Sequence, residues 1–350
     1  MVPLLVTVVG GNAVTAAAVL GCLNTADANA LRRLHPVFAA HVAAIAWADS
    51  TTNVYNTVLW RAMFPAAVAC KPCSVTGTTT TGIGAGTWFV VERPVQLEGA
   101  SLAALRGVTV LNLESSVIND AVVAALPPTL QHLSVSGCRR LTQCVSFTHL
   151  PALEALDCSA TNVKLDNLPP TLRELVCTPS KAADFCHLRS LRMLKCFALC
   201  DTRSVATLPP SLEELDVRCC TWPRDWSAAH LTRLAVLRAN NCDFYAAALA
   251  TLRPSLRILD LQTCKFLSCG ASFAHLTNLH TLSLRCTNVL DEALATLPPS
   301  LVSLDLAGST FVTEHAVFPR LPALRVLNVL GTCLSGHATV ASLTRGLEYR

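Results

Sequence analysis

Apolar residues recur along most of the chain in the pattern L-x-x-L-x-L. Two clear copies are Leu212-Glu-Glu-Leu215-Asp-Val217 and Leu301-Val-Ser-Leu304-Asp-Leu306. The pattern starts, at steps of 19 to 23 residues, at Val108, Leu130, Leu153, Leu172, Leu191, Leu212, Leu234, Leu256, Leu279, Leu301 and Leu324. Self-similarity at this period predicts a solenoid in which every repeat contributes one strand and contacts only its neighbours.

The residues that precede each strand alternate between two forms. One form is Leu-Pro-Pro, at 126–128, 168–170, 208–210 and 297–299 with a variant at 252–254; the other is His-Leu, at His149, His187, His230 and His275. Paired prolines lack N–H donors and favour an extended approach to the strand. We expect a helical turn before the His-Leu form, as at 180–186. Short helices are also expected at 119–126 and 291–297, where an acidic cap precedes good helix formers.

Side chains between the two inner apolar positions of each strand should face the open side of the sheet. Their central members include Asp216, Arg238 and Asp260, a row of alternating sign. Arginines, an asparagine and an aromatic residue among paired charges are typical of protein interfaces. The predicted partner-binding residues are Met193, Lys195, Phe197, Glu214, Asp216, Arg218, Arg238, Asn240, Asp260, Gln262 and Arg285. The alternative is a solvated sheet face whose charges only hold the register.

Eight residues after the pattern starts, the chain has a cysteine in four repeats, at Cys138, Cys220, Cys242 and Cys264. With this position the chain resembles the leucine-rich-repeat superfamily, closest to its cysteine-containing type and similar to repeat proteins of protozoan parasites. The resemblance implies an α/β fold, a curved solenoid with a parallel sheet on its concave side, and protein binding. The solenoid is expected over 95–350, as about eleven repeats plus the start of a twelfth.

Residues 1–94 lack the repeat and predict helices at 13–23, 27–34, 37–45 and 53–69, with a linker at 76–87. The segment resembles an F-box, although its opening Leu-Pro is missing and small residues stand at 39–44. That resemblance implies a Skp-type adaptor bound through Leu23, Leu31 and Leu34, and a substrate receptor of a cullin-type ubiquitin ligase. A helical cap on the first repeat is the alternative. The uncharged stretch 1–22 leaves a signal sequence open.

Composition narrows the function classes. Hydrophobic residues make up 52% and charged residues 14% of the chain, so an ordered core is expected. The net charge of +4 comes from scattered Lys and Arg, which argues against a nucleic-acid partner. The 17 cysteines, several of them at a repeating apolar position, predict reduced thiols and an intracellular, cytoplasmic protein. Outside the N-terminal stretch, no segment is long and apolar enough to span a membrane, so no membrane partner is expected.

No pattern predicts catalysis. Cys70-Lys-Pro-Cys73 has metal or redox spacing but lacks a second ligand pair, and 82–86 lacks the lysine of a phosphate loop. The chain is therefore predicted to be no enzyme, with no cofactor and no metal. Its expected function is a protein-protein interaction module that binds a partner on the concave sheet. The alternatives are a structural component of a larger assembly, suggested by a last repeat without a polar cap, and a secreted or surface receptor.

Overall fold

The computed structural model describes residues 20, 23–32, 36–54, 57–72, 97, 100–178, 183–197, 202–220, 222–267 and 270–334. The predicted helix at 13–23 lies almost wholly outside these residues, and the linker at 76–87 lies outside them entirely. The chain forms two units, one of residues 1–163 with 167–169 and one of 164–166 with 170–350. The short η1 (Leu165–Asn167) falls where the chain passes from one to the other.

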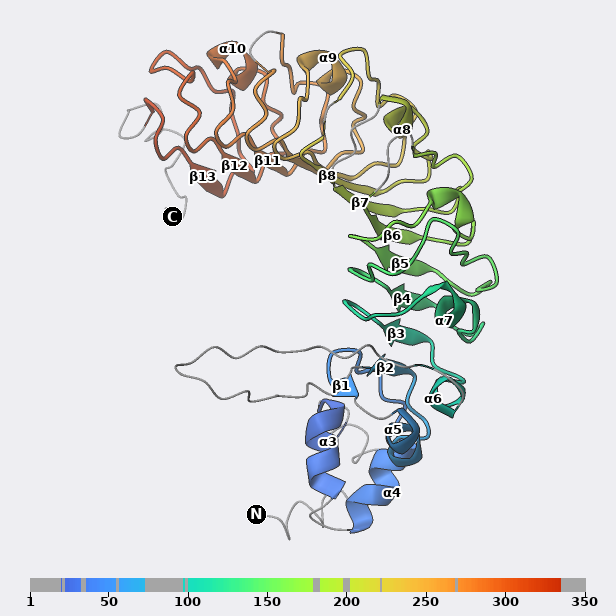
Figure 1. Ribbon diagram of the computed structural model, residues 1–350. Helices are drawn as coiled ribbons and strands as arrows, with labels where there is room; N and C mark the ends of the chain where they lie inside the picture. Colours follow the sequence, from blue (N-terminus) through green and yellow to red (C-terminus); the bar gives the residue numbers. More distant parts are fainter. Residues whose placement is uncertain are drawn as a thin grey trace, which may run out of the picture. The chain divides into compact units, whose positions relative to one another are not determined.

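Unit 1 begins with helices and continues into the first repeats (Figure 1). Its helices are α3 (Thr25–Arg32), α4 (Pro36–Ala44), α5 (Thr57–Met63), α6 (Ala100–Ala103) and α7 (Asp120–Ala124). Its strands are β1 (Asn53–Val54), β2 (Ala69–Pro72), β3 (Val110–Asn112), β4 (His132–Ser134) and β5 (Ala155–Cys158), all parallel and in chain order. The predicted helices at 27–34 and 37–45 are confirmed by α3 and α4.

The N-terminal segment also contains strands that the sequence did not predict. The stretch 53–69, expected as one helix, divides into β1, α5 and the start of β2. Strand β2 pairs in parallel with β3, and the carbonyl of Val68 accepts hydrogen bonds from the N–H groups of Thr109 and Val110. The parallel sheet therefore includes two strands that precede the first predicted repeat, and they cover its edge as a cap does.

Unit 2 consists of stacked coils with one strand each. Its strands are β6 (Glu174–Cys177), β7 (Met193–Phe197), β8 (Glu214–Arg218), β9 (Val236–Arg238), β10 (Ile258–Asp260), β11 (Thr281–Ser283), β12 (Ser303–Asp305) and β13 (Val326–Asn328), again parallel and in chain order. Helices α8 (Thr202–Ala206), α9 (Ala246–Leu249) and α10 (Asp291–Leu294) lie on the side opposite the strands (Figure 1). All eleven predicted strands are confirmed, each beginning two residues after the start of its pattern.

The repeated leucines fill the core of each coil. The leucine at the second position of every strand from β6 to β12 is at most 1% exposed. The cysteine position is also buried, and its thiol donates to a carbonyl of the preceding coil, from Cys138 to Leu113 at 3.1 Å and from Cys264 to Ala239 at 3.0 Å. Ser309 occupies the same position and donates to Leu284 at 2.6 Å. The position thus satisfies backbone oxygens where the chain leaves the strand.

The alternation of the two lead-ins corresponds to a structural alternation. Helices α7 to α10 all stand before the Leu-Pro-Pro form or its variant. Before His187 the described residues 183–186 form no helix, and residues 180–182 of the turn expected there lie outside the described part. A threonine after the helix joins the two forms. Thr296 Oγ1 accepts the N–H of Phe273 from the preceding coil at 2.9 Å and donates to Ala293, and Thr207 accepts from Phe185 in the same way.

One expected helix cap is wrong. Leu290, not an acidic residue, is the N-cap of α10 and makes no side-chain cap. The carboxylate of Asp291 turns instead to the next coil, where it accepts the N–H of Thr313 at 2.9 Å and its hydroxyl. Asp120 binds Thr142 identically. An acidic residue at the start of a convex helix therefore connects successive coils rather than capping its own helix.

Candidate protein-binding surface

The predicted partner-binding residues lie on the strand face of unit 2, from β7 to just beyond β11. Strand register places Lys195, Asp216, Arg238 and Asp260 opposite one another in a row, with Ser283 next. A second row begins with Phe197 opposite Arg218. Because neighbouring parallel strands are about 4.8 Å apart, side chains in one row are within reach of each other. The structure thus brings the predicted residues together on one surface.

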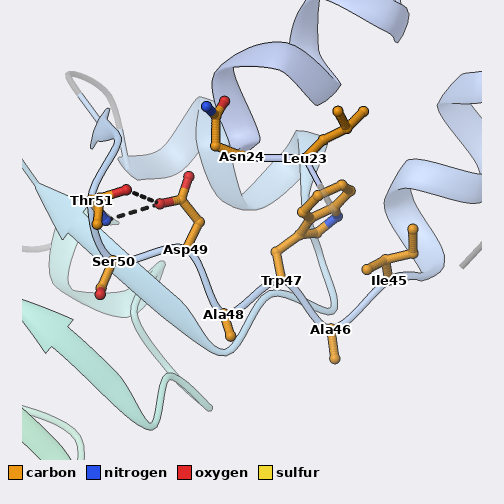
Figure 2. A pocket seen from close by; sticks show the side chains of 9 residues that line it. All are labelled: Leu23, Asn24, Ile45, Ala46, Trp47, Ala48, Asp49, Ser50 and Thr51. Atoms are coloured by element: carbon orange, nitrogen blue, oxygen red, sulfur yellow. Dashed lines mark hydrogen bonds between the residues drawn. The ribbon is translucent and has the colours of Figure 1, made fainter. Parts of the chain in front are cut away.

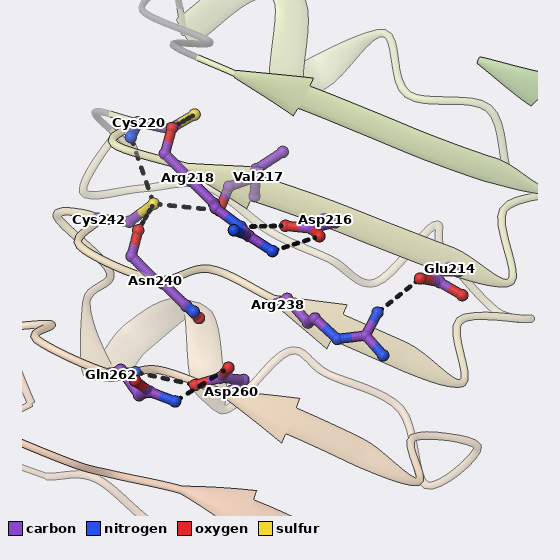
Figure 3. A network of polar contacts seen from close by, with 10 residues as sticks. All are labelled: Glu214, Asp216, Val217, Arg218, Cys220, Arg238, Asn240, Cys242, Asp260 and Gln262. Carbon is purple, nitrogen blue, oxygen red and sulfur yellow. Dashed lines mark hydrogen bonds and ion pairs between the residues drawn. The ribbon is translucent and has the colours of Figure 1, made fainter. Parts of the chain in front are cut away.

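Asp216 holds Arg218 in a fixed position. The guanidinium donates two hydrogen bonds to the carboxylate, Nε to Oδ1 at 3.1 Å and Nη2 to Oδ2 at 3.2 Å (Figure 3). The Asp216 side chain is 5% exposed and the Arg218 side chain 50% exposed. This hydrogen bond raises the pKa of Arg218 above its ordinary value, so the arginine stays charged. Asp216 therefore positions Arg218, and only the arginine is accessible to a partner.

The other charges on the face pair differently from the simple row. Arg238 forms an ion pair with Glu214, one strand back and diagonally displaced, at 2.5 Å. The Asp260 carboxylate accepts from the backbone and the side chain of Gln262 at 3.2 and 3.4 Å (Figure 3). Asp216, Arg238 and Asp260 are neighbours in register, but the expected ladder is not made of bonds between them. Asp216 and Arg218 are two residues apart on one strand, so their side chains point to the same face. This spacing is a sequence signal that would have indicated the pair.

Several of the predicted residues have accessible side chains that form no ion pair with any described residue. Phe197 is 38% exposed although it is aromatic. Lys195 is half-buried and Arg285 exposed, and within the described part of the chain neither side chain makes a hydrogen bond or ion pair. Met193 lies half-buried in the row of Glu214. The face therefore combines an apolar ring, a positioned arginine and two cations with no acidic partner.

Buried thiols support the face from behind. Cys242 donates to Val217 at 3.5 Å, and its sulfur accepts the N–H of Cys220 at 3.3 Å (Figure 3). The hydrogen bond from the Cys220 side chain lowers the pKa of Cys242, whereas burial raises the pKa of Cys264 to about 12. None of the cysteines in the described ranges forms a disulfide. These thiols belong to the core and do not reach the face.

The residues predicted to bind an adaptor are only partly described. Leu23 lines an open pocket of about 500 Å³ together with Ile45, Trp47 and Asp49 (Figure 2). Leu31 is half-buried on α3, and Leu34 lies outside the described residues. The pocket mixes apolar and polar linings, since Ser50 and Thr51 complete it. Leu23 and Leu31 are thus both accessible in part, on the helical portion of unit 1.

Two of the four lead-in histidines bond to the preceding coil, whereas the buried Nε2 of His187 has no hydrogen-bond partner among the described residues. His149 Nε2 lies 3.1 Å from the carbonyl of Val123, and His275 Nε2 lies 3.1 Å from that of Leu249, both in the preceding coil. No three His, Cys, Asp or Glu residues of the described ranges gather as metal ligands. Burial raises the pKa of Cys70 to about 12, which disfavours a thiolate there; Cys73 and residues 82–86 lie outside the described part. No helix among the residues described is long and apolar enough to cross a bilayer.

The comparisons with known proteins define the fold class. No protein-family model matches the chain, and no curated protein sequence does. A leucine-rich-repeat protein of Leptospira interrogans is similar in structure, with a TM-score of 0.56 at 15% identity over 91% of this chain and 85% of that chain. The fold is that of the leucine-rich-repeat proteins, as the repeat pattern predicted.

Two chains seen in complexes share the fold. The Toll–Spatzle complex of Drosophila matches with a TM-score of 0.51 at 15% identity, covering 76% of this chain and 39% of that chain. The TLR13–ssRNA13 complex matches with a TM-score of 0.50 at 18% identity, covering 83% and 41%. The chain thus spans about two fifths of those two chains.

Proposed function

We propose that the chain is a binding module that holds a protein partner on the strand face of unit 2, centred on Phe197 and Arg218. One observation carries the proposal: Arg218 is half-exposed beside an exposed aromatic ring and is fixed by a buried carboxylate. Arginine and aromatic side chains contribute most to binding free energy at protein interfaces. An arginine that is already oriented loses less conformational entropy when it binds.

The neighbouring chemistry fits a polypeptide partner. Lys195 and Arg285 flank the centre and form no ion pair with the described residues, so a partner with carboxylates toward the edges of its contact surface is expected. Within the fold class, the Toll chain is seen with the protein Spatzle and the TLR13 chain with an RNA. The aromatic ring and the short charge pairs on this face favour a protein over a phosphate backbone, which would need a continuous basic surface.

The test is affinity capture with the tagged chain, followed by titration calorimetry with the captured protein. The double variant Phe197→Ala/Arg218→Ala should weaken binding by about a hundredfold, since each central residue of an interface contributes about 1 to 2 kcal/mol. The single variant Asp216→Asn should lose about tenfold, because it keeps the shape of the side chain and removes the charge that fixes Arg218.

A matched control is available outside the face. Phe311→Ala/Arg224→Ala removes the same two residue types, an exposed ring and an exposed arginine, from positions after the strands. We expect unchanged affinity for this control. Equal losses in both double variants, or full binding by the Phe197→Ala/Arg218→Ala protein, would contradict the proposal.

A second candidate function concerns the helical part of unit 1. The accessible Leu23 and Leu31 support the F-box hypothesis, in which they bind a Skp-type adaptor and the chain is a substrate receptor of a ubiquitin ligase. Pairing of β2 with β3 supports the alternative of a cap. The structural-component and secreted-receptor alternatives, and the intracellular location, stay predictions.

The adaptor hypothesis has its own measurement. Leu23→Asp/Leu31→Asp should reduce binding to a purified Skp-type adaptor at least tenfold, because both changes put charge into an apolar contact. Partner binding at Phe197 should persist. The exposed Ala30→Asp is the control on the same helix. If the unchanged chain does not bind the adaptor, the helices serve as a cap only.

A further inference from the structure

Arginines that are scattered in the sequence gather along one flank of unit 2. The residue immediately after each pattern start is stacked on its counterpart in the previous coil, and its N–H donates to that residue's carbonyl at 2.7 or 2.8 Å. This unbroken column consists of Arg173, Arg192, Glu213, Ala235, Arg257, His280, Val302 and Arg325. The turn before the column adds Arg189, Arg233, Arg253 and Arg320. We call these twelve residues the arginine flank.

The charge of the arginine flank is strongly one-sided. It contains eight arginines, all exposed, and Glu213 as its one acidic residue. That excess is larger than the net charge of +4 for the whole chain, so the remainder of the chain is net acidic. The expectation that basic residues are scattered is therefore wrong for the folded molecule, because the repeat brings distant arginines into one row.

The repeat architecture does not require this charge. The equivalent column in unit 1 consists of Thr109, Gln131 and Glu154, joined by the same backbone hydrogen bonds at 2.8 Å. These residues are neutral or acidic. The basic character of the column is thus a property of unit 2 and not of the position in the repeat, although the turn before Val108 in unit 1 also carries an arginine, Arg106.

We infer that the arginine flank is a second interaction surface, which binds an extended acidic segment of a polypeptide. Eight coils at about 4.8 Å span roughly 34 Å, the length of about ten residues of extended chain. All the cations are arginines, whose planar fork binds carboxylates in bidentate geometry, and the flank contains no lysine.

Two features favour an acidic peptide over other polyanions. Glu213 interrupts the row and binds Arg233 at 2.9 Å, so a polymer with a negative charge at every unit meets repulsion there. A peptide can place a neutral or basic side chain opposite Glu213. The flank also has no Phe, Tyr or Trp to stack on bases or to enter a bilayer interface.

The test uses a fluorescent peptide of eleven glutamates and one central glutamine, which can lie opposite Glu213, with fluorescence anisotropy at low and at physiological salt. Arg189→Gln/Arg192→Gln/Arg257→Gln should weaken binding about tenfold. It removes three exposed ion pairs with the peptide, and each exposed pair contributes only modestly to the binding free energy. Arg106→Gln/Arg139→Gln/Arg140→Gln removes the same charge from exposed sites in unit 1 and should change binding less than twofold. Glu213→Gln should tighten binding, because it frees Arg233 and removes a repulsive charge.

The comparison probes are a single-stranded DNA of twelve nucleotides, a duplex of equal length and phosphatidylserine vesicles. Tighter binding of any of these, equal losses in the two triple variants, or no binding of the peptide would overturn the inference. Phe197→Ala/Arg218→Ala should leave peptide binding unchanged, so this result is independent of the proposed function of the strand face.

Discussion

Replacing Phe273 by alanine is expected to lower the free energy of unfolding by about 4 kcal/mol. The ring is completely buried, two residues before His275 in a His-Leu lead-in. Phe147 and Phe185 have the same place in their repeats and are also 0% exposed. Truncation removes apolar contact area and leaves a cavity, because the backbone is held by the hydrogen bond between Phe273 N–H and Thr296.

Urea unfolding followed by circular dichroism measures the effect. Phe311→Ala is the control, since that ring is 57% exposed and its loss should change stability by less than about 0.5 kcal/mol. A Phe273→Ala protein as stable as the Phe311→Ala protein would show that the ring does not contribute to the core. Each coil contacts only its neighbours, so the transition should also broaden as the coils on either side of Phe273 lose coupling.

The strands could be predicted from the sequence because one constraint acts on every repeat. The second residue of each of these strands is buried in the coil, and leucine at that place recurs eleven times. The buried polar position could be predicted for the same reason. Cys264 and Ser309 each donate a hydrogen bond to the equivalent carbonyl of the preceding coil, which would otherwise have no partner. Repetition converts a weak local signal into a strong one.

The N-terminal strands could not be predicted, because they occur once each. Strand β1 has two residues and β2 has four, which include Lys71 and Pro72. Neither stretch alternates apolar and polar residues. They are strands because the first repeat offers free N–H and C=O groups at its edge, and that tertiary requirement outweighs local propensity.

The sequence predicted which side chains share the strand face, but not which of them form hydrogen bonds and ion pairs with each other. Strand period and register indicate which side chains share a face, so Asp216, Arg238 and Arg218 were grouped correctly. Their bonds depend on side-chain length and direction: the long arginine of Arg238 reaches diagonally to Glu214, and Asp216 accepts from its own strand. The arginine flank was missed because it exists only after the coils are stacked.

Asp49→Ala is expected to lower the free energy of unfolding by about 2 kcal/mol. The carboxylate accepts five hydrogen bonds: from the N–H and hydroxyl of Thr25 at 2.8 Å, from the same groups of Thr51 at 2.9 and 2.7 Å, and from the N–H of Thr52 at 3.1 Å. Thr25 is the first residue of α3, where a negative charge also interacts favourably with the helix dipole. Charge-assisted bonds contribute about 1.5 to 3 kcal/mol each when buried, and less here because Asp49 is only half-buried.

Hydrogen exchange of the peptide covering α3 measures the loss where it occurs, and Asp27→Ala is the control. Asp27 is exposed in the first turn of the same helix, where only the dipole interaction of about 0.5 kcal/mol is lost. If both variants exchange equally fast, the carboxylate of Asp49 does not hold the start of α3.

Acid should produce the same loss in the unchanged chain. Burial alone would raise the pKa of Asp49, but the hydrogen bonds from Thr52, Thr25 and Thr51 outweigh it, so the pKa lies well below the ordinary value of 3.8. A carboxyl whose pKa is lower in the folded state stabilises the fold above the unfolded pKa, and this contribution is lost as the pH falls through the folded value. Protection of α3 should therefore decrease below about pH 4 in the unchanged chain, whereas the Asp49→Ala protein should lack this part of the pH dependence. Parallel pH profiles in the two proteins would show that another group governs the acid lability of α3.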